Sequence, residues 1–149
     1  MGTRSAIGYM TPEGKVRAKY SHYDGYVSYT GAILQEHYQE ARKIAQMVEL
    51  GDQSGIAPEI YATEPGHSFA TPQDGVTVFY GRDRGEDNVD AQEFDTVAEF
   101  VDYYAGAGCE YFYLRSNADW IVHDRYGVGK DALGHAVFDL VSVKLAAEA

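Results

Sequence analysis

The chain has 149 residues, close to the commonest size of a single folded domain. Hydrophobic residues make up 45% of it and charged residues 23%, which is ordinary for a globular protein and argues against a mainly disordered chain. The formal net charge of -11 argues against binding along a nucleic-acid phosphate backbone, since that affinity comes from Lys and Arg. A basic protein partner, or a small ligand in a local basic pocket, suits the charge better. Acidity that only maintains solubility is the alternative.

The chain contains one cysteine, Cys109, so it cannot form an internal disulfide or a thiolate metal cluster. This composition indicates a reducing compartment. Small residues precede Cys109 and an apolar strand pattern follows it, which favours a buried structural thiol over a nucleophile. The N-terminus lacks the apolar core of a secretion signal and the length of a membrane span, so we expect a cytoplasmic protein without a membrane partner.

Two strand patterns open the chain, at residues 5–10 and 15–21, where alternate side chains are apolar. The turn between them contains Pro12, which presets its backbone angle, and Gly14, which relieves the exit. These segments therefore predict a hairpin. Three cations give it one basic face: Lys15, Arg17 and Lys19.

Two helices are predicted next, a short one over residues 30–38 and a stronger one over residues 39–50. In the second, apolar side chains recur at the i, i+3, i+4, i+7 spacing of one helix face: Ala41, Ile44, Ala45 and Val48. Gly51 is placed to end this helix. Turn-forming residues then recur over residues 51–75 without periodicity, which predicts a long surface loop that is either functional or poorly ordered.

The middle of the chain alternates a strand with a helix. Residues 76–80 form a β-branched and aromatic run that is typical of a buried strand. A helix over residues 96–105 is indicated by an apolar face and by Thr96 and Glu99, which stand at capping-box spacing.

A second hairpin, with strands over residues 110–115 and 119–124, precedes a final helix that Asp131 caps and that reaches about residue 147. The element order is therefore β-β-α-α-β-α-β-β-α. Because hairpins cannot be parallel crossovers, we expect a single α+β domain over residues 1–149. Its five-stranded sheet is antiparallel or mixed and is built from the two hairpins and the strand at 76–80. About four helices pack on it.

The first candidate binding site lies where the first hairpin meets the first helix, and it consists of Tyr20, His22, Tyr23, Asp24 and Tyr26. On an extended strand His22 and Asp24 would face one side, where the carboxylate could orient the imidazole for proton transfer. In the alternative, the Asp-Gly pair is a turn and His22 fills a rim.

The second candidate binding site consists of Arg82, Asp83, Arg84 and Glu86, which follow the predicted strand at 76–80. Two arginine forks can clamp a phosphate or carboxylate, and the flanking glycines would let a ligand approach the backbone. In the alternative, the carboxylates pair internally with the arginines in a solvated loop. The segment lacks the glycine-lysine signature of a nucleoside-triphosphate loop, which disfavours ATP hydrolysis.

No metal site and no cofactor are predicted, because the five histidines have neither the i, i+4 spacing nor the cysteine neighbours of a zinc site. These histidines are His22, His37, His67, His123 and His135.

The thirteen tyrosines gather at the first candidate site and on the second hairpin. Tyrosine favours interfaces and stacking, although core packing explains it equally well. The acidic residues 86–95 could imitate a phosphate backbone or meet a basic host protein. A solvated loop that leads to a helix cap is the alternative.

Four short segments stand in a recognisable order between residues 3 and 86. They are Thr3-Arg4-Ser5-Ala6-Ile7-Gly8, His22-Tyr23-Asp24-Gly25-Tyr26, Leu34-Gln35-Glu36-His37-Tyr38 and Phe79-Tyr80-Gly81-Arg82-Asp83-Arg84-Gly85-Glu86. This order resembles a family of small uncharacterised proteins of tailed bacteriophages and some bacteria, with TRSxIG, HxDGY and RDRGE segments. In its Asp-Gly segment this chain has Tyr23 and Val27, where tryptophan and proline are expected in the family. The resemblance implies an accessory protein that acts in the cytoplasm of an infected host cell, and it carries over no catalytic residue.

These features predict a non-enzymatic phage accessory protein that binds and inhibits or sequesters a host factor in antiviral defence. That factor is either a protein or a nucleotide-like signal. The contact surface would combine tyrosines of the first site with the acidic residues 86–95, or would enclose the signal with Arg82 and Arg84.

Two alternatives stay open. One is a small phosphodiester- or nucleotide-processing hydrolase, with His22 as acid or base, Asp24 orienting it, and Arg82 or Arg84 stabilising a phosphoryl oxyanion. The other is a virion or self-assembling structural protein, in which the Tyr-rich strands and the apolar C-terminal helix would form a homo-oligomer contact.

Overall fold

The computed structural model describes residues 3–116, 119–124 and 136–139. Its strands are β1 (Ser5–Met10), β2 (Val16–Ser21), β3 (Gln92–Phe94), β4 (Tyr111–Ser116), β5 (Asp119–Asp124) and β6 (Ala136–Asp139). Its helices are α1 (Ala32–His37), α2 (Ala41–Glu49), α3 (Tyr80–Arg84) and α4 (Val97–Gly106), and a π-helical turn, η1 (Val27–Gly31), leads into α1. Among these residues, no helix combines the length and the apolar character needed to cross a membrane.

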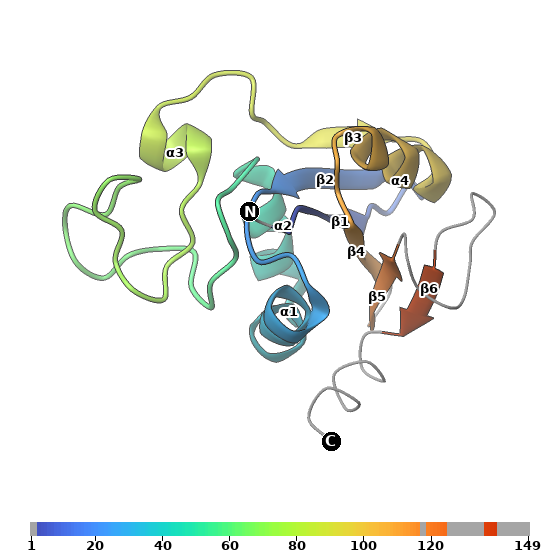
Figure 1. The fold of residues 1–149 in the computed structure, drawn as a ribbon, viewed down its shortest axis with the longest axis horizontal. Coiled ribbons are helices and arrows are strands. Elements are labelled where there is room, and N and C mark those ends of the chain that lie inside the picture. The colour runs from blue at the N-terminus through green and yellow to red at the C-terminus, as the bar shows by residue number, and fades with distance from the viewer. Residues whose placement is uncertain (1–2, 117–118, 125–135, 140–149) are drawn as a thin grey trace.

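All the described strands form one mixed sheet in the order β3-β2-β1-β4-β5-β6 (Figure 1). The central pair, β1 and β4, is parallel, and the two hairpins β1-β2 and β4-β5 are antiparallel. In the first hairpin turn Gly14 has a φ of 81° and its amide donates to the Thr11 carbonyl at 2.9 Å. The predicted α+β class, with a mixed sheet built on two hairpins, is confirmed.

Helices cover both faces of the sheet, so the molecule has two cores. Helices α1 and α2 enclose one core, whose buried members include Ile7, Leu34, Met47, Tyr113 and Trp120. Helix α4 encloses the other, with Ala6, Val16, Phe100, Phe112 and Cys109 among its buried members. Figure 1 shows α4 and α1 on opposite sides of the strands. The expectation that Cys109 is buried is confirmed, since its exposure is 0%.

Local sequence signals determine where α2 ends and where α4 begins. Gly51 adopts a φ of 85° directly after α2, a conformation that glycine reaches without steric cost. At the start of α4 the Thr96 hydroxyl accepts the Glu99 amide at 3.1 Å, and the Glu99 carboxylate accepts the Asp95 amide at 3.2 Å. Both predicted helices are therefore present within one or two residues of their expected bounds.

The strand predicted at residues 76–80 is wrong. Val76 and Phe79 take part only in isolated bridges, to Glu59 and Gln53, and the chain then turns into α3. The cause is local, because the Asp83 carboxylate accepts the Phe79 amide at 2.9 Å and so draws the backbone into a helical turn. The short strands β3 and β6 occupy the two edges of the sheet instead.

The helix predicted over residues 131–147 is wrong at residues 136–139, and the rest of it lies outside the described residues. These four residues form β6, which pairs antiparallel with β5. Their sequence, Ala-Val-Phe-Asp, contains two good strand formers, and the unpaired edge of β5 supplies backbone partners that a helix prediction from periodicity ignores.

Two predictions of exposure are also wrong. Residues 51–75 do not simply cross the surface, because Gln53 and Ile56 are 0% exposed and Ile60 is 3% exposed. Lys19, expected on a basic hairpin face, is likewise 0% exposed. Arg17 and Lys19 do share a face, but α2 packs on that face and covers Lys19.

Substituting Gly51 with alanine should lower the free energy of unfolding by about 2 to 4 kcal/mol, the sum of left-handed backbone strain and overpacking. An added Cβ would collide with the Val89 carbonyl oxygen. That oxygen cannot easily retreat, because it accepts the Asp52 amide at 2.8 Å.

Gly14 is the matched control, since its φ of 81° is similar and no atom lies within 4 Å of the added Cβ. Gly14→Ala should therefore cost only about 1 kcal/mol of backbone strain. Urea denaturation of both variants measures the difference, and equal losses would show that the close approach of Gly51 to Val89 is unimportant.

Candidate functional site

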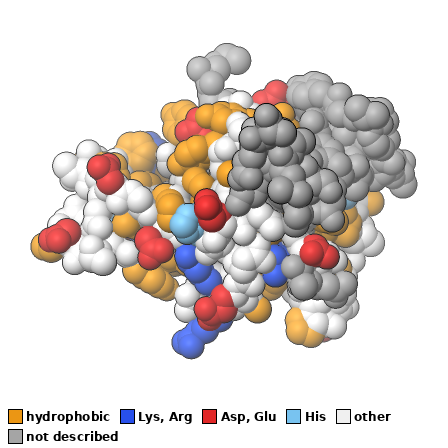
Figure 2. Space-filling model, turned by 90° about the horizontal axis from the view of Figure 1, so that it is seen from below, with side chains coloured by type: hydrophobic (Ala, Val, Ile, Leu, Met, Phe, Trp, Pro, Cys, Tyr) orange, Lys and Arg blue, Asp and Glu red, His pale blue; other side chains and the backbone are white. Residues whose placement is uncertain are grey.

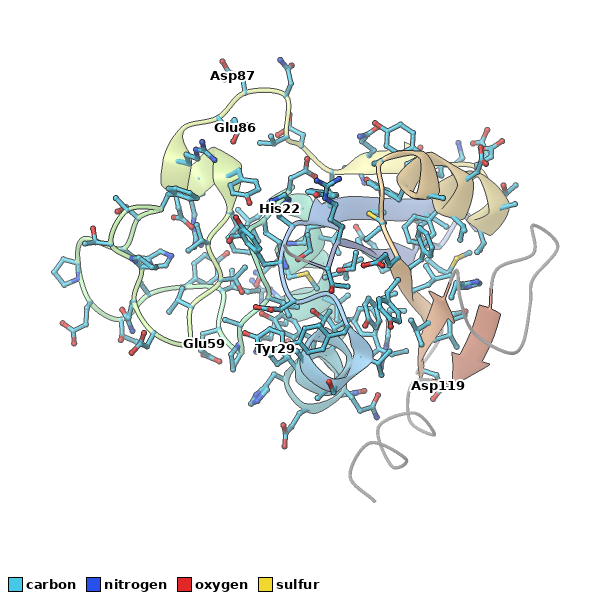
Figure 3. All side chains as sticks on the ribbon, in the orientation of Figure 1. His22, Tyr29, Glu59, Glu86, Asp87 and Asp119 are labelled. Atoms are coloured by element: carbon cyan, nitrogen blue, oxygen red, sulfur yellow. The ribbon has the colours of Figure 1, made fainter. Side chains whose placement is uncertain are left out.

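The first part of the candidate site is a tyrosine-histidine pair at the end of β2, where Figure 3 labels His22. Strand alternation directs Tyr20 and His22 to the same side, and the Tyr20 hydroxyl lies 2.7 Å from His22 Nδ1. Burial, together with the positive charge of Arg4, lowers the pKa of His22. Burial likewise raises the pKa of Tyr20 to about 12. Near pH 7 His22 is therefore neutral, and in the tautomer that carries its proton on Nε2 it accepts a hydrogen bond from the Tyr20 hydroxyl at Nδ1.

Tyr23 extends this pair toward solvent. Its ring meets the His22 ring edge-on at 4.4 Å between centroids, and 45% of the residue is exposed. The backbone holds both residues in place, because the His22 amide donates to the Gln53 carbonyl at 3.1 Å and the Tyr23 amide donates to the Ser54 carbonyl at 2.7 Å.

The same short segment, residues 52–54, also binds the chain that leads into α3. The Ser54 amide donates to the Val78 carbonyl at 2.9 Å, and the Tyr80 amide donates to the Asp52 carbonyl at 3.0 Å. Tyr80 is thereby brought close enough to Tyr23 that, after burial, the neighbouring phenol contributes to raising the Tyr80 pKa. Residues 22–23 and residues 78–80 lie some sixty positions apart in the chain. They are thus held together through their hydrogen bonds to residues 52–54.

The outer part of the site is built from Phe69, Tyr80 and Arg84. The Arg84 guanidinium lies 4.5 Å from the Phe69 ring centroid and 5.7 Å from that of Tyr80, and the two rings are 6.2 Å apart. Phe69 is 44% exposed, and its amide is held by the Asp83 carbonyl at 3.0 Å. We call His22, Tyr23, Phe69, Tyr80 and Arg84 together the aromatic surface.

Arg82 and Asp83 are engaged in hydrogen bonds and ion pairs apart from this surface. Arg82 donates to the Ile60 and Thr77 carbonyls at 2.8 and 3.3 Å and pairs with Asp83 at 2.9 Å. Asp83 also contacts His67 at 3.4 Å. Burial opposes ionisation of Asp83, but hydrogen bonds from Arg82 and from the Phe79 amide outweigh it and lower the Asp83 pKa. The predicted two-arginine clamp is therefore not formed, because Arg82 bonds to Ile60, Thr77 and Asp83, whereas Arg84 lies against the rings of Phe69 and Tyr80.

Asp24 does not orient His22. The strand ends before Asp24, whose φ of 56° places it in a left-handed turn, and its carbonyl accepts the Thr30 hydroxyl at 2.6 Å. Tyr20 occupies the His22 Nδ1 position that a carboxylate would need. The predicted His22–Asp24 pair is thus replaced by a His22–Tyr20 pair, and Asp24 has a left-handed backbone conformation beyond the end of the strand.

Tyr26 and Glu86 are predicted site residues that do not belong to the aromatic surface. Tyr26 is 39% exposed and its ring lies 6.2 Å from that of Tyr29. Glu86 is exposed and approaches Arg84 at 3.9 Å, and Figure 3 labels it beside Asp87 on the stretch that leaves α3. On the α1 side of the molecule, Figure 2 shows acidic side chains scattered singly, several of them beside Lys, Arg or His side chains.

Sequence reasoning missed Phe69 and Tyr80 as members of this site. Phe69 is a lone aromatic residue within the polar stretch 63–74, a placement that signals exposure. The sequence pattern predicts Tyr80 in a buried strand, whereas in the structure Tyr80 begins α3 and is partly exposed. Within the described part of the chain, no group of three or more His, Cys, Asp or Glu side chains is arranged to hold a metal ion.

Comparisons with protein-family models, with curated proteins and with solved structures found no match to this chain.

Proposed function

We propose that this protein is a non-enzymatic accessory protein of phage type that inhibits or sequesters a host protein by binding it through the aromatic surface. The observation that carries the proposal is the exposure of Tyr23 and Phe69, 45% and 44%, on backbone that hydrogen bonds hold in place. Interface centres are enriched in Tyr, Phe and Arg, and rings held in place bind with little loss of entropy.

A protein partner fits this surface better than a nucleotide-like signal. A site for a small ligand encloses about 70 to 90% of that ligand, whereas these two rings stand open to solvent. Exposed acidic residues at its border, Glu86, Asp87 and Asp90, add to a net charge of -11. The partner should therefore present an apolar patch with basic side chains around it.

Substituting Tyr23 with alanine should weaken binding to the partner by about thirtyfold, the effect of removing one central aromatic contact. Affinity capture from lysate of a bacterial host, followed by titration of the captured protein, measures the change. Tyr103→Ala is the matched control, because Tyr103 is 49% exposed on α4, outside the aromatic surface. Both variants should fold normally.

Equal losses in Tyr23→Ala and Tyr103→Ala would contradict the proposal, as would unchanged affinity in both. Calorimetric titration with cyclic and linear nucleotides tests the other ligand class directly. If a nucleotide binds and Tyr23→Ala abolishes its heat, the signal-sequestering form replaces the protein-binding form. Capture of a second copy of this chain would instead support the self-assembling alternative.

A further inference from the structure

A separate cavity lies at the opposite end of the first hairpin from the aromatic surface. It has a volume of about 350 Å³, within the range of small-molecule sites. Its lining comes from the end of β1, the turn that follows, the start of α2 and the end of β4: Tyr9, Met10, Thr11, Pro12, Gln39, Ala41, Ile44 and Arg115. Because β1 and β4 are parallel, their carboxyl ends meet at this edge of the sheet.

Most of the side chains that line the cavity are apolar or have polar groups that are already hydrogen-bonded. Met10, Pro12, Ala41 and Ile44 offer hydrocarbon. Tyr9 presents its ring, because its hydroxyl donates to Glu49 at 2.8 Å and burial, with that bond, raises its pKa to about 12. Glu49 is itself neutralised by Arg17, whose Nε donates to it at 2.9 Å. Glu49, the partner of Tyr9, is therefore paired and is not a free negative charge.

Arg115 is the cation of the cavity. Its Nη1 and Nη2 donate to the side-chain and main-chain oxygens of Gln39 at 2.8 and 3.3 Å, which uses two of its five N–H donors. Its guanidinium carbon lies 5.9 Å from the Trp120 ring centroid, at the outer limit of a cation–π contact. Among the described residues no carboxylate comes within 4.0 Å of it, whereas Arg17, Arg82 and Arg84 are each paired with one.

We propose that this cavity binds a small organic monocarboxylate, with its carboxylate on Arg115 and its apolar body against Met10, Pro12 and Ile44. A planar guanidinium with spare donors matches a planar carboxylate. A phosphate dianion fits less well, since one cation faces the cavity and the whole chain carries a net charge of -11. This site is independent of the aromatic surface and of the partner proposed for it.

Hexanoate is the test probe, with hexan-1-ol as its uncharged analogue and inorganic phosphate as the anion without an apolar body. Ligand-observed NMR and calorimetry with the intact protein should show hexanoate binding at least about tenfold tighter than either analogue, because hydrogen bonds to a charged group dominate. Equal binding of hexan-1-ol or of phosphate would overturn the monocarboxylate assignment, as would absence of hexanoate binding.

Two variants test whether hexanoate binds in this cavity and at Arg115. Arg115→Met should weaken hexanoate binding by at least about tenfold. Arg42→Met should not, because it removes an exposed charge on α2 that does not line the cavity. Ala41→Phe fills the cavity from an exposed helix position and should abolish binding while the protein keeps its thermal midpoint. Hexanoate affinity that survives in both Arg115→Met and Ala41→Phe would overturn the proposal.

Discussion

The free energy of unfolding should rise with pH through the range just below about pH 10, the usual lysine pKa, and replacing Lys19 by methionine should remove that rise. Lys19 is 0% exposed, and burial holds its pKa well below the usual lysine value, with Asp52 offsetting part of the effect. Its Nζ lies 2.6 Å from the Met47 carbonyl oxygen and also bonds Gln53 Oε1. These two acceptors match the two N–H bonds of a neutral amine.

The direction of this pH dependence follows from which state, folded or unfolded, binds the Lys19 proton. The unfolded chain keeps this lysine protonated up to about pH 10.4, whereas the folded chain releases the proton at lower pH. Between those two values the unfolded state binds the extra proton, so stability rises with pH by about 1.4 kcal/mol per unit. Above about pH 10 buried tyrosines such as Tyr20 act in the opposite sense, because their raised pKa values let the folded state hold the extra protons.

Urea denaturation across this window compares the natural protein with Lys19→Met and with Lys15→Met as the control. Lys15 is exposed and lies 3.3 Å from Asp95, which raises its pKa, so it titrates above the window. We expect Lys15→Met to keep the slope of the natural protein. A slope that persists in Lys19→Met would mean that the buried amine remains charged.

Replacing Trp120 by alanine should lower the free energy of unfolding by about 3 to 5 kcal/mol, the cost of truncating a large buried side chain. Trp120 on β5 is 0% exposed, and its Nε1 donates to the Tyr38 carbonyl at 2.8 Å, where α1 ends. The side chain therefore joins the second hairpin to the helical layer. A loss of this size is a large share of the stability of an ordinary domain.

Circular dichroism is the appropriate probe, because Trp120 is the single tryptophan of the chain and its loss removes tryptophan fluorescence. Tyr61→Ala is the control, since Tyr61 is 58% exposed, and its truncation should cost less than about 1 kcal/mol. Trp120→Phe should fall between the two, because it keeps a ring but leaves the Tyr38 carbonyl unpaired. Comparable losses in Trp120→Ala and Tyr61→Ala would contradict this account of the core.

The candidate site shows which of its residues local sequence patterns can predict and which they cannot. The sequence singled out His22, Tyr23 and Arg84, all of which belong to the aromatic surface. It grouped Arg82 with Arg84 because they are two positions apart, yet in α3 the two side chains diverge, one to the Ile60 carbonyl and one to Phe69. It also overlooked residues 52–54, whose backbone hydrogen bonds join the two halves of the site.

Elements whose causes lie within a few residues were predictable from the sequence by itself. The first hairpin follows from strand alternation and from the turn that Gly14 permits. Helix α4 follows from the Thr96 cap, and α2 from its apolar face and from Gly51. In each case the deciding interactions are made within the element or at its ends, so they are visible in a short stretch of sequence.

Other features were decided only by the tertiary structure, because their causes lie far apart in the chain. Lys19 is buried since α2 packs on its face of the sheet, and residues 136–139 are a strand since β5 offers them an unpaired edge. The backbone at Tyr23 and at Tyr80 is brought together since residues 52–54 hydrogen-bond to both. Periodicity tells which side chains share a face, but only the packing of distant segments decides whether that face is covered or open.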